Sequence, residues 1–368
     1  MHYSNSVYPM PAWEQRKLGE LADIVGGGTP DTNNEKYWGG DIDWYSPAEL
    51  DSSIYVEKSL RRITDEGLLS CAARMLPANK TILFTSRAGI GNTAILRRSA
   101  CTNQGFQSLV VQDGTDVYFI YSMSSKIKKW AEAKASGSTF LEISGRQLGT
   151  MQIAVPSSHE QRQIGQLFSR LDALITLHQR KYDKLGELKK SLLEKMFPKE
   201  GEIFPEIRFA GFADPWEQRK LGELVDVRSG RDYQHLEEGP IPVYGTGGYM
   251  TGVNEALSYD EDAIGIGRKG TIDKPYRLFA PFWTVDTLFY AVPRENVNLD
   301  FALCLFRNVD WKSKDESTGL PSLSKTIINE SDVYVPRNPE QRQIGQLFSR
   351  LDALITLHQR KHNNTYTE

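Results

Sequence analysis

A stretch of 22 residues that occurs twice constrains this chain more than any other feature. The sequence EQRQIGQLFSRLDALITLHQRK stands at Glu160–Lys181 and stands again, unchanged, at Glu340–Lys361. A shorter stretch, WEQRKLGEL, occurs at Trp13–Leu21 and at Trp216–Leu224. Repeats at this separation indicate a structural unit that is used more than once. We therefore predict two tandem units, each of which begins with the short repeat and ends with the long one.

The composition agrees with two folded units. One hydrophobic core rarely serves 368 residues, and the content of 39% apolar and 25% charged residues is typical of a folded protein. No run of about 18 apolar residues predicts a membrane span, and no secretory signal precedes Trp13. The three cysteines, Cys71, Cys101 and Cys304, form no C-x-x-C pair. We expect a cytoplasmic protein without a membrane partner.

The net charge of −3 argues against a chain that coats DNA indiscriminately, because such a chain would be strongly basic. A local basic face remains compatible with this net charge, since the electrostatic field at a binding surface depends on the charges nearby. The six histidines show no spacing typical of zinc ligands, so we expect no metal site.

The long repeat predicts a helix with one apolar stripe, because its apolar residues recur at spacings of three and four. We place one helix in 157–200 and its copy in 337–368, and we predict that the two pair antiparallel as a coiled coil. The alternative is that each helix packs only on its own unit. His178 and His358 interrupt the stripe at matching positions and are read as a polar notch rather than a metal pair. The stripe consists of Ile164, Leu167, Leu171, Leu174, Leu185, Leu188 and Leu192, and of Ile344, Leu347, Leu351 and Leu354.

The two variable segments, within the domains 1–156 and 201–336, predict mixed helices and strands, so the fold class is α+β. Helices are expected at Val117–Lys134 and Leu299–Trp311. Strands are expected at Ile82–Thr85, Leu109–Gln112, Ala263–Gly267 and Leu288–Val292.

The variable segments also align with each other. Ile82–Gly89 aligns with Ala263–Gly270, which sets Arg87 against Arg268, and Thr102–Phe106 aligns with Thr284–Leu288. One fold therefore carries two different surfaces.

These features resemble the DNA-specificity subunit of type I restriction–modification systems. The resemblance rests on the tandem architecture, on GGGTP, YWGG and W within 26–44, on TSRAGIGNTAI followed by TNQGF, and on LKKSLLEKMFP before PEIRFAGF. The closing motif P-x-x-E-Q-x-x-I-x-x-x-F-x-x-L-D-x-x-I adds to it. The resemblance implies two target-recognition domains, each of which reads one half of a bipartite double-stranded DNA sequence. It also implies a non-catalytic subunit whose paired helices space the domains and dock two methyltransferase subunits, through which restriction and translocase subunits join.

The resemblance assigns no cofactor to this chain. S-adenosylmethionine, ATP and Mg²⁺ are expected in the partner subunits. This agrees with the sequence, which contains no G-x-x-x-x-G-K-[ST] loop and no dinucleotide fingerprint.

Candidate DNA contacts are polar residues at matching places in the two units. A strand that ends in Arg and Gly suits recognition of phosphate or guanine, and side-chain amides can bond adenine. The alternatives are an arginine held by a carboxylate, and amides that close turns. The candidates are Thr85, Ser86, Arg87, Asn103, Gln104, Gln107, Ser138 and Thr139 in the first unit, and Arg268, Lys269, Thr284, Asp286, Ser317 and Thr318 in the second.

Two other functions stay open at this stage. A stand-alone DNA-binding regulator would bind its site without partners, although helix-turn-helix signals are absent. A nuclease fragment would use Glu132 and Lys134, which resemble the end of a nuclease motif but have no convincing acidic partner in a strand.

Overall fold

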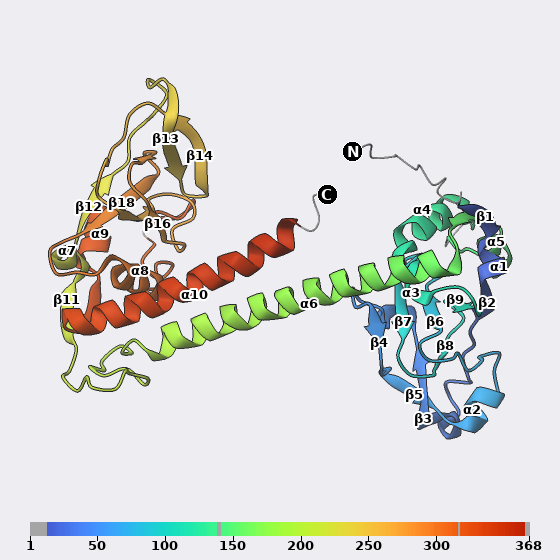
Figure 1. The fold of residues 1–368 in the computed structure, drawn as a ribbon. Coiled ribbons are helices and arrows are strands. Elements are labelled where there is room, and N and C mark those ends of the chain that lie inside the picture. The colour runs from blue at the N-terminus through green and yellow to red at the C-terminus, as the bar shows by residue number, and fades with distance from the viewer. Residues whose placement is uncertain (1–12, 138–140, 316, 365–368) are drawn as a thin grey trace, which may run out of the picture. The chain divides into compact units, whose positions relative to one another are not determined.

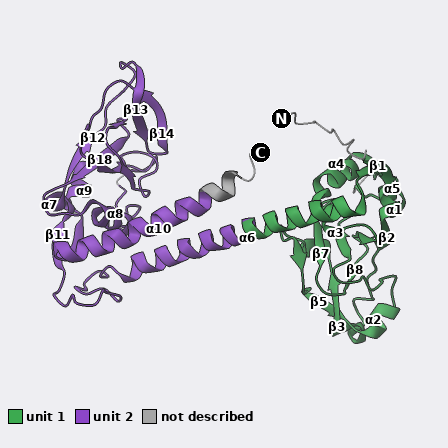
Figure 2. Cartoon of the chain, viewed as in Figure 1, with its two compact units in different colours: residues 1–174 green, residues 175–368 purple. Residues whose placement is uncertain are grey.

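The computed structural model describes residues 13–137, 141–315 and 317–364, with side chains as far as Gln359. The chain divides into two compact units, unit 1 (residues 1–174) and unit 2 (residues 175–368), shown in Figure 2. Both units mix helices and strands, so the predicted fold class is confirmed. The finer division at 156, 200 and 336 stays a prediction.

Unit 1 contains a five-stranded sheet and two smaller ones (Figure 1). The five strands lie in the order β2 (Ala22–Gly26), β9 (Gln107–Val111), β6 (Thr81–Phe84), β7 (Thr93–Leu96) and β4 (Tyr55–Val56). The three-stranded sheet has the order β5 (Arg61–Ile63), β3 (Trp38–Tyr45) and β8 (Cys101–Thr102), and β1 (Glu14–Lys17) pairs with β10 (Gln152–Val155). Its helices are α1 (Leu18–Leu21), α2 (Asp65–Leu69), α3 (Val117–Ser122), α4 (Ser124–Lys134), α5 (Gly145–Gly149) and the first part of α6 (Ser158–Lys195).

Unit 2 repeats this plan with one strand fewer in the large sheet. That sheet has the order β12 (Val225–Ser229), β18 (Leu288–Pro293), β15 (Ala263–Gly267) and β16 (Tyr276–Leu278). The smaller sheets have the order β14 (Gly248–Val253), β13 (Glu238–Gly245) and β17 (Trp283–Thr284), and β11 (Glu217–Lys220) with β19 (Asp332–Val335). The remaining helices are α7 (Leu221–Leu224), α8 (Leu299–Asn308), α9 (Lys325–Glu330) and α10 (Asn338–Asn364).

The strand registers show which residues of the two units are equivalent. Thr85 faces Phe106 in unit 1, and Gly267 faces Leu288 in unit 2. The residue after each of these also makes an equivalent backbone hydrogen bond. The N–H of Ser86 donates to the carbonyl of Gly105 in unit 1, and the N–H of Arg268 donates to the carbonyl of Thr287 in unit 2. The sequence alignment of the Arg87 segment is therefore wrong by one residue. Arg268 stands at the place of Ser86, and Lys269 stands at the place of Arg87.

The duplicated helices dock on their units in the same way. A glycine allows each helix to approach the preceding segment closely, because a Cβ on Gly165 would lie 2.1 Å from Asp116 Oδ1 and one on Gly345 would lie 2.3 Å from Asn298 Oδ1. The backbone N–H of Asp116 donates to Gln161 Oε1 at 3.2 Å, and that of Asn298 donates to Gln341 Oε1 at 3.2 Å. The first turns of both repeats are thus fixed by identical side chains.

Within unit 2, the second half of α6 lies along α10 (Figure 1). His178 Nδ1 lies 2.9 Å from His358 Nδ1, Lys189 pairs with Asp352, and the ring of Phe197 packs near that of Phe348. The residue numbers of these contacts fall along α10 as they rise along α6 and on to Phe197, just beyond its end, so the two helices are antiparallel. The predicted helix pair is therefore confirmed within unit 2, and α6 begins at Ser158 and ends at Lys195, inside the predicted segment 157–200.

The predicted stripe is only partly buried. Ile344 and Leu351 lie in the core of unit 2, and Leu185, Leu192 and Leu347 pack against it. Leu188 and Leu354, which belong to the same stripe, are 47% and 44% exposed. In unit 1, Ile164 is partly buried, whereas Leu167, Leu171 and Leu174 are exposed.

Candidate nucleic-acid interface

The edge of the large sheet in unit 2 carries a basic pocket. A cavity of about 410 Å³ lies beside the end of β15, between that strand and the start of α9. Its lining includes three cations, Arg268, Lys269 and Lys325, and no carboxylate. Ser229 and Phe289, which face each other across β12 and β18, complete one side. We call Ser229, Arg268, Lys269, Phe289 and Lys325 the unit 2 rim.

Backbone hydrogen bonds hold the two strand-end cations of the unit 2 rim. The N–H of Arg268 donates to Thr287 O at 2.8 Å, and its carbonyl accepts from Leu323 at 2.9 Å. The Arg268 guanidinium donates only to the backbone oxygen of Asp286, at 3.4 Å, and no described carboxylate pairs with it or with Lys269. Both side chains are exposed. Their donors are therefore available to phosphate oxygens or to the guanine edge.

The equivalent place in unit 1 has different chemistry. The strand registers show that Gly26 of unit 1 is equivalent to Ser229 of unit 2, and that Gln107 is equivalent to Phe289. Arg87, at the place of Lys269, is half-buried and makes no hydrogen bond or ion pair with a described residue. Gly145 makes room for the amide, because a Cβ there would lie 2.7 Å from Gln107 Oε1. We call Gly26, Ser86, Arg87, Gln107 and Gly145 the unit 1 rim.

The predicted amide cluster divides into two roles. Asn103 Oδ1 accepts from the N–H of Gly105 at 2.8 Å, so this side chain closes a turn, as the alternative interpretation stated. Gln104 is exposed, and its amide oxygen accepts from the hydroxyl of Thr29. Asp286, which follows the equivalent turn in unit 2, is also exposed. Gln104, Gln107 and Asp286 therefore stay candidates for reading bases.

Three predicted contacts are corrected by burial. Thr85, Ser86 and Thr284 are fully buried, so their side chains do not reach a ligand at the surface. The Thr85 hydroxyl donates to Gly89 O and accepts from the N–H of Asn92, which closes the loop that carries Arg87. The hydroxyls of Ser86 and Thr284 have no hydrogen-bond partner among the described residues.

The predicted DNA contacts in the two serine- and threonine-containing loops differ in what the structure shows of them. Ser317 donates from both its N–H and its hydroxyl to Asp315 Oδ1 at 2.9 Å, which makes it part of a turn. Thr318 is exposed. Ser138 and Thr139 lie outside the described residues.

Sequence reasoning missed Lys325, Ser229 and Phe289 as members of the rim. A signal for Lys325 was present, because it follows Ser324, and both Ser324 and its counterpart Ser144 cap the short helix that begins beside the rim. Ser229 and Phe289 carry no such signal. Only the pairing of β12 with β18 brings them together.

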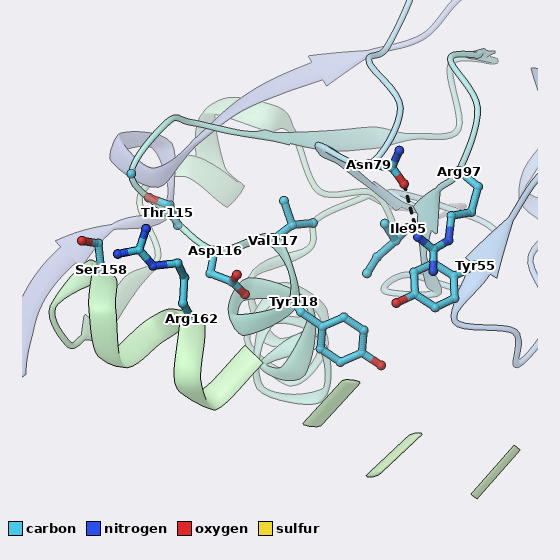
Figure 3. A pocket seen from close by; sticks show the side chains of 11 residues that line it. Tyr55, Asn79, Ile95, Arg97, Thr115, Asp116, Val117, Tyr118, Ser158 and Arg162 are labelled. Carbon is cyan, nitrogen blue, oxygen red and sulfur yellow. Dashed lines mark hydrogen bonds between the residues drawn. The ribbon is translucent and has the colours of Figure 1, made fainter. Parts of the chain in front are cut away.

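A second cavity, of about 360 Å³, lies in unit 1 beside the start of α6 (Figure 3). The Arg97 guanidinium stacks on Tyr55 at 3.6 Å and donates to Asn79 at 3.4 Å. Arg162 and Asp116 lie on its other side (Figure 3). No member of the unit 1 rim lines this cavity, so it is a separate feature.

The described residues offer no catalytic constellation. They contain no group of three or more His, Cys, Asp or Glu side chains that could hold a metal ion. Burial raises the pKa of the Cys101 and Cys304 thiols to about 12, which leaves both protonated near neutral pH. Glu132 and Lys134 lie on α4, a helix, and not on a strand beside other acids. Within the same ranges, no helix combines the length and apolar character that crossing a bilayer requires.

Most of this chain is similar in sequence to proteins of one known family. The model of a family described as "Type I restriction modification DNA specificity domain" matches residues 10–187 and 213–365. The chain is 32% identical over 384 residues to the "Type I restriction enzyme MjaIX specificity subunit" of Methanocaldococcus jannaschii, which covers 95% of this chain and 89% of that protein. It is 29% identical over 195 residues to the EcoR124I/EcoR124II specificity subunit of Escherichia coli, covering 48% of this chain and 47% of that one.

A solved structure shares the fold. The type I restriction–modification S subunit from M. genitalium superposes with a TM-score of 0.65 at 20% identity, covering 99% of this chain and 94% of that one. The similarity at this identity concerns the fold alone.

Proposed function

Because this chain belongs to the family of type I restriction–modification DNA specificity domains, we propose that each of its two units reads one part of a two-part DNA target. Its relatives are named specificity subunits of type I restriction enzymes, so the chain is the DNA-recognition subunit and not the catalytic one. These relatives favour this function over a stand-alone regulator or a nuclease fragment.

One observation carries the proposal: the same scaffold presents unlike side chains at equivalent places. Unit 2 offers Arg268, Lys269 and Lys325 around its cavity. The five residues of the unit 1 rim include one cation, Arg87, and the amide of Gln107. Arginine and lysine suit guanine or phosphate, whereas an amide that both donates and accepts suits adenine. Two such rims on one frame are what two different half-sequences require.

Partners supply the rest of the activity in this proposal. Methyltransferase subunits dock on the paired helices, and restriction and translocase subunits join through them. S-adenosylmethionine, ATP and Mg²⁺ belong to those subunits. The assembly works in the cytoplasm, where the DNA is, and the length of α6 sets the spacer between the two half-sequences.

The proposal is tested by methylome sequencing of a host that carries this chain with its methyltransferase partner. Gln107→Ala is expected to relax the methylated motif in one half only, because each lost base contact costs about 1–3 kcal/mol of discrimination. Arg268→Ala with Lys269→Ala is expected to change or weaken only the other half. Glu132→Ala and Glu255→Ala, at exposed positions outside the rims, serve as matched controls.

The pattern of change decides the outcome. Variants of both rims that leave the motif intact, or that alter the same half, would refute the assignment of one half to each unit.

A further inference from the structure

Each unit exposes an apolar side chain at an edge strand of its three-stranded sheet. Leu60, immediately before β5, is 88% exposed, and Met250, within β14, is 51% exposed. A single exposed leucine or methionine is common in folded proteins and needs no functional explanation. The pair becomes informative if both side chains hold the same place in the repeated fold.

The middle strands of the two sheets supply the reference for this comparison. Tyr45, at the end of β3, faces Thr102 of β8 in unit 1. Tyr244, near the end of β13, faces Thr284 of β17 in unit 2. The two tyrosines are therefore equivalent.

The edge strands can be aligned from these tyrosines. Arg61 faces the residue before the first tyrosine, and Thr251 faces the residue before the second. The residues that precede Arg61 and Thr251 are Leu60 and Met250. The two units, whose rims differ, thus share an exposed apolar side chain at one equivalent position.

In unit 1, the short helix Pro47–Glu49 holds Leu60 and also contacts the rim. The backbone N–H of Leu60 donates to Glu49 Oε2 at 2.7 Å. Pro47 lies against Gly105, since a Cβ on that glycine would be 2.6 Å from Pro47 Cγ. The carbonyl of Gly105 accepts from the N–H of Ser86, a member of the unit 1 rim, at 2.8 Å. The exposed leucine is therefore attached to a fixed backbone that is joined to the rim.

In unit 2, the β13–β14 hairpin is fixed in a similar way. Gly245 makes room for Met250, because a Cβ there would lie 2.7 Å from Met250 Sδ. The carbonyl of Gly245 accepts from the Tyr276 hydroxyl at 2.6 Å, which ties the hairpin to the large sheet. Thr246 Oγ1, at the tip, would lie 3.9 Å from a Cβ on Gly270, the residue after the two strand-end cations of the unit 2 rim.

Cations and aromatic rings accompany both side chains. Arg61 follows Leu60, is exposed, and stacks on the ring of Trp38 at 3.6 Å. No described carboxylate forms an ion pair with Arg61. Tyr249, beside Met250, is 68% exposed and packs edge-on against Tyr244 at 6.3 Å. Apolar side chains next to cations are the combination that DNA-bending proteins insert between base pairs.

The position of these strands favours DNA over a protein as the occupant. In Figure 1, β3 and β5 lie on the side of unit 1 away from α6, and β13 and β14 lie on the side of unit 2 away from α10. The helices on which a methyltransferase docks in the proposed function are therefore on the other side of each unit.

We propose that Leu60 and Met250 are wedges that enter the base stack of the DNA, one in each half of the target, with Tyr249 stacking beside Met250. The inference rests on the proposed function, because it requires each unit to meet its own half-sequence. An inserted side chain unstacks one base step and kinks the duplex, while neighbouring cations bind the phosphates. Since pyrimidine–purine steps unstack most easily, each half should contain or adjoin such a step.

The test uses the chain with its methyltransferase partner and a duplex that carries the motif found by methylome sequencing. The base 2-aminopurine, whose fluorescence rises on unstacking, replaces in turn each adenine except the methylated one. We expect a rise at one step in each half with the wild-type complex. Leu60→Ala should abolish the rise in one half only, and Tyr249→Ala combined with Met250→Ala should abolish it in the other.

Two control variants alter equally exposed side chains in acidic surroundings. Leu69, on α2, is 85% exposed, and Tyr259 is 63% exposed. Each has two acidic residues within four positions along the chain. Leu69→Ala and Tyr259→Ala should leave both fluorescence signals unchanged, and circular dichroism confirms that every variant is folded.

The outcomes separate this inference from the proposed function. Binding of the motif without unstacking at any step, or unstacking that persists in both wedge variants, would overturn the wedges and leave the proposed function intact. Loss of the methyltransferase from a wedge variant in size-exclusion chromatography would overturn them too, because the side chain would then contact protein. A wild-type complex that does not bind its motif would refute the proposed function, and the wedges with it.

Discussion

At the scale of single residues, burial separates the candidates that can meet DNA from those that support them. Arg268 and Lys269 are exposed at the end of a strand, whereas Thr284 is fully buried. Sequence reasoning found the loops but could not see which side chains point inward. The error of one residue between Arg87 and Arg268 has a similar origin, because it is visible only in which residue each strand sets opposite Phe106 and Leu288.

Phe168 and Phe348 occupy the same position of the long repeat and offer a prediction at this scale, since Phe168 is 43% exposed and Phe348 is 1% exposed. Phe348→Ala should lower the free energy of unfolding by about 3–5 kcal/mol, because it empties a dry aromatic cluster. Phe168→Ala should cost less than about 1 kcal/mol, because its ring is already partly in water. Urea denaturation of the two variants measures the difference, and equal losses would contradict the packing described for the two repeats.

Asp352 gives unit 2 a dependence on pH. Burial by itself would raise the pKa of this carboxyl, but the hydrogen bonds and charges of Lys189 and Arg307 outweigh burial and hold the pKa below its ordinary value of 3.8. A carboxyl with a lowered pKa in the folded state stabilises the fold fully above that ordinary value, and the effect is lost as the pH falls from there through the lowered pKa of the folded state. Asp352→Asn should therefore destabilise unit 2 at pH 7, by about 1 kcal/mol after allowance for its partial exposure, and by progressively less as the pH falls below 3.8.

Urea midpoints of wild type and Asp352→Asn across this pH range test the prediction. Asp172→Asn is the matched control, since Asp172 holds the same position in the other repeat and no described cation pairs with it. A difference that stays constant with pH would rule out the ionic explanation.

At the scale of elements, the strands were predicted better than the helices were. The strand Ala263–Gly267 agrees in both ends, and the three others agree within two residues. The single helix expected at Val117–Lys134 is interrupted at Met123, which separates α3 from α4. Ser122 and Ser124 explain the break, because their hydroxyls donate to the carbonyls of Phe119 and Tyr121 and so compete with the helical pattern. Apolar periodicity alone does not report such local competition.

The helix pair in unit 2 contains a polar contact that can be tested. His178 and His358 are half-buried and meet through their Nδ1 atoms at 2.9 Å. A polar pair in an apolar seam favours one register at a cost in stability. Replacing both with leucine should therefore raise the free energy of unfolding by about 1 kcal/mol, and each single replacement should gain less than half of that. A double variant less stable than the wild type would show that the histidine pair stabilises the seam.

At the scale of the whole molecule, the repeats alone predicted the duplication, while the different environments of the two copies became visible only through packing. Identical sequences at Phe168 and Phe348 cannot reveal that one is covered and the other exposed. The chain combines two copies of a frame, two different rims and one helix, α6, that begins in unit 1 and ends in unit 2. The central claim is that each rim reads its own half of the target.

The most direct measurement places the unit 1 reading segment, 22–156, where residues 225–336 stand, and leaves both repeats and α6 unchanged. Methylome sequencing of a host that carries this chain with its methyltransferase partner then reports the motif. The account predicts that both halves now show the sequence formerly read by unit 1, with the spacer length retained. A motif that keeps its two original, unlike halves would contradict it.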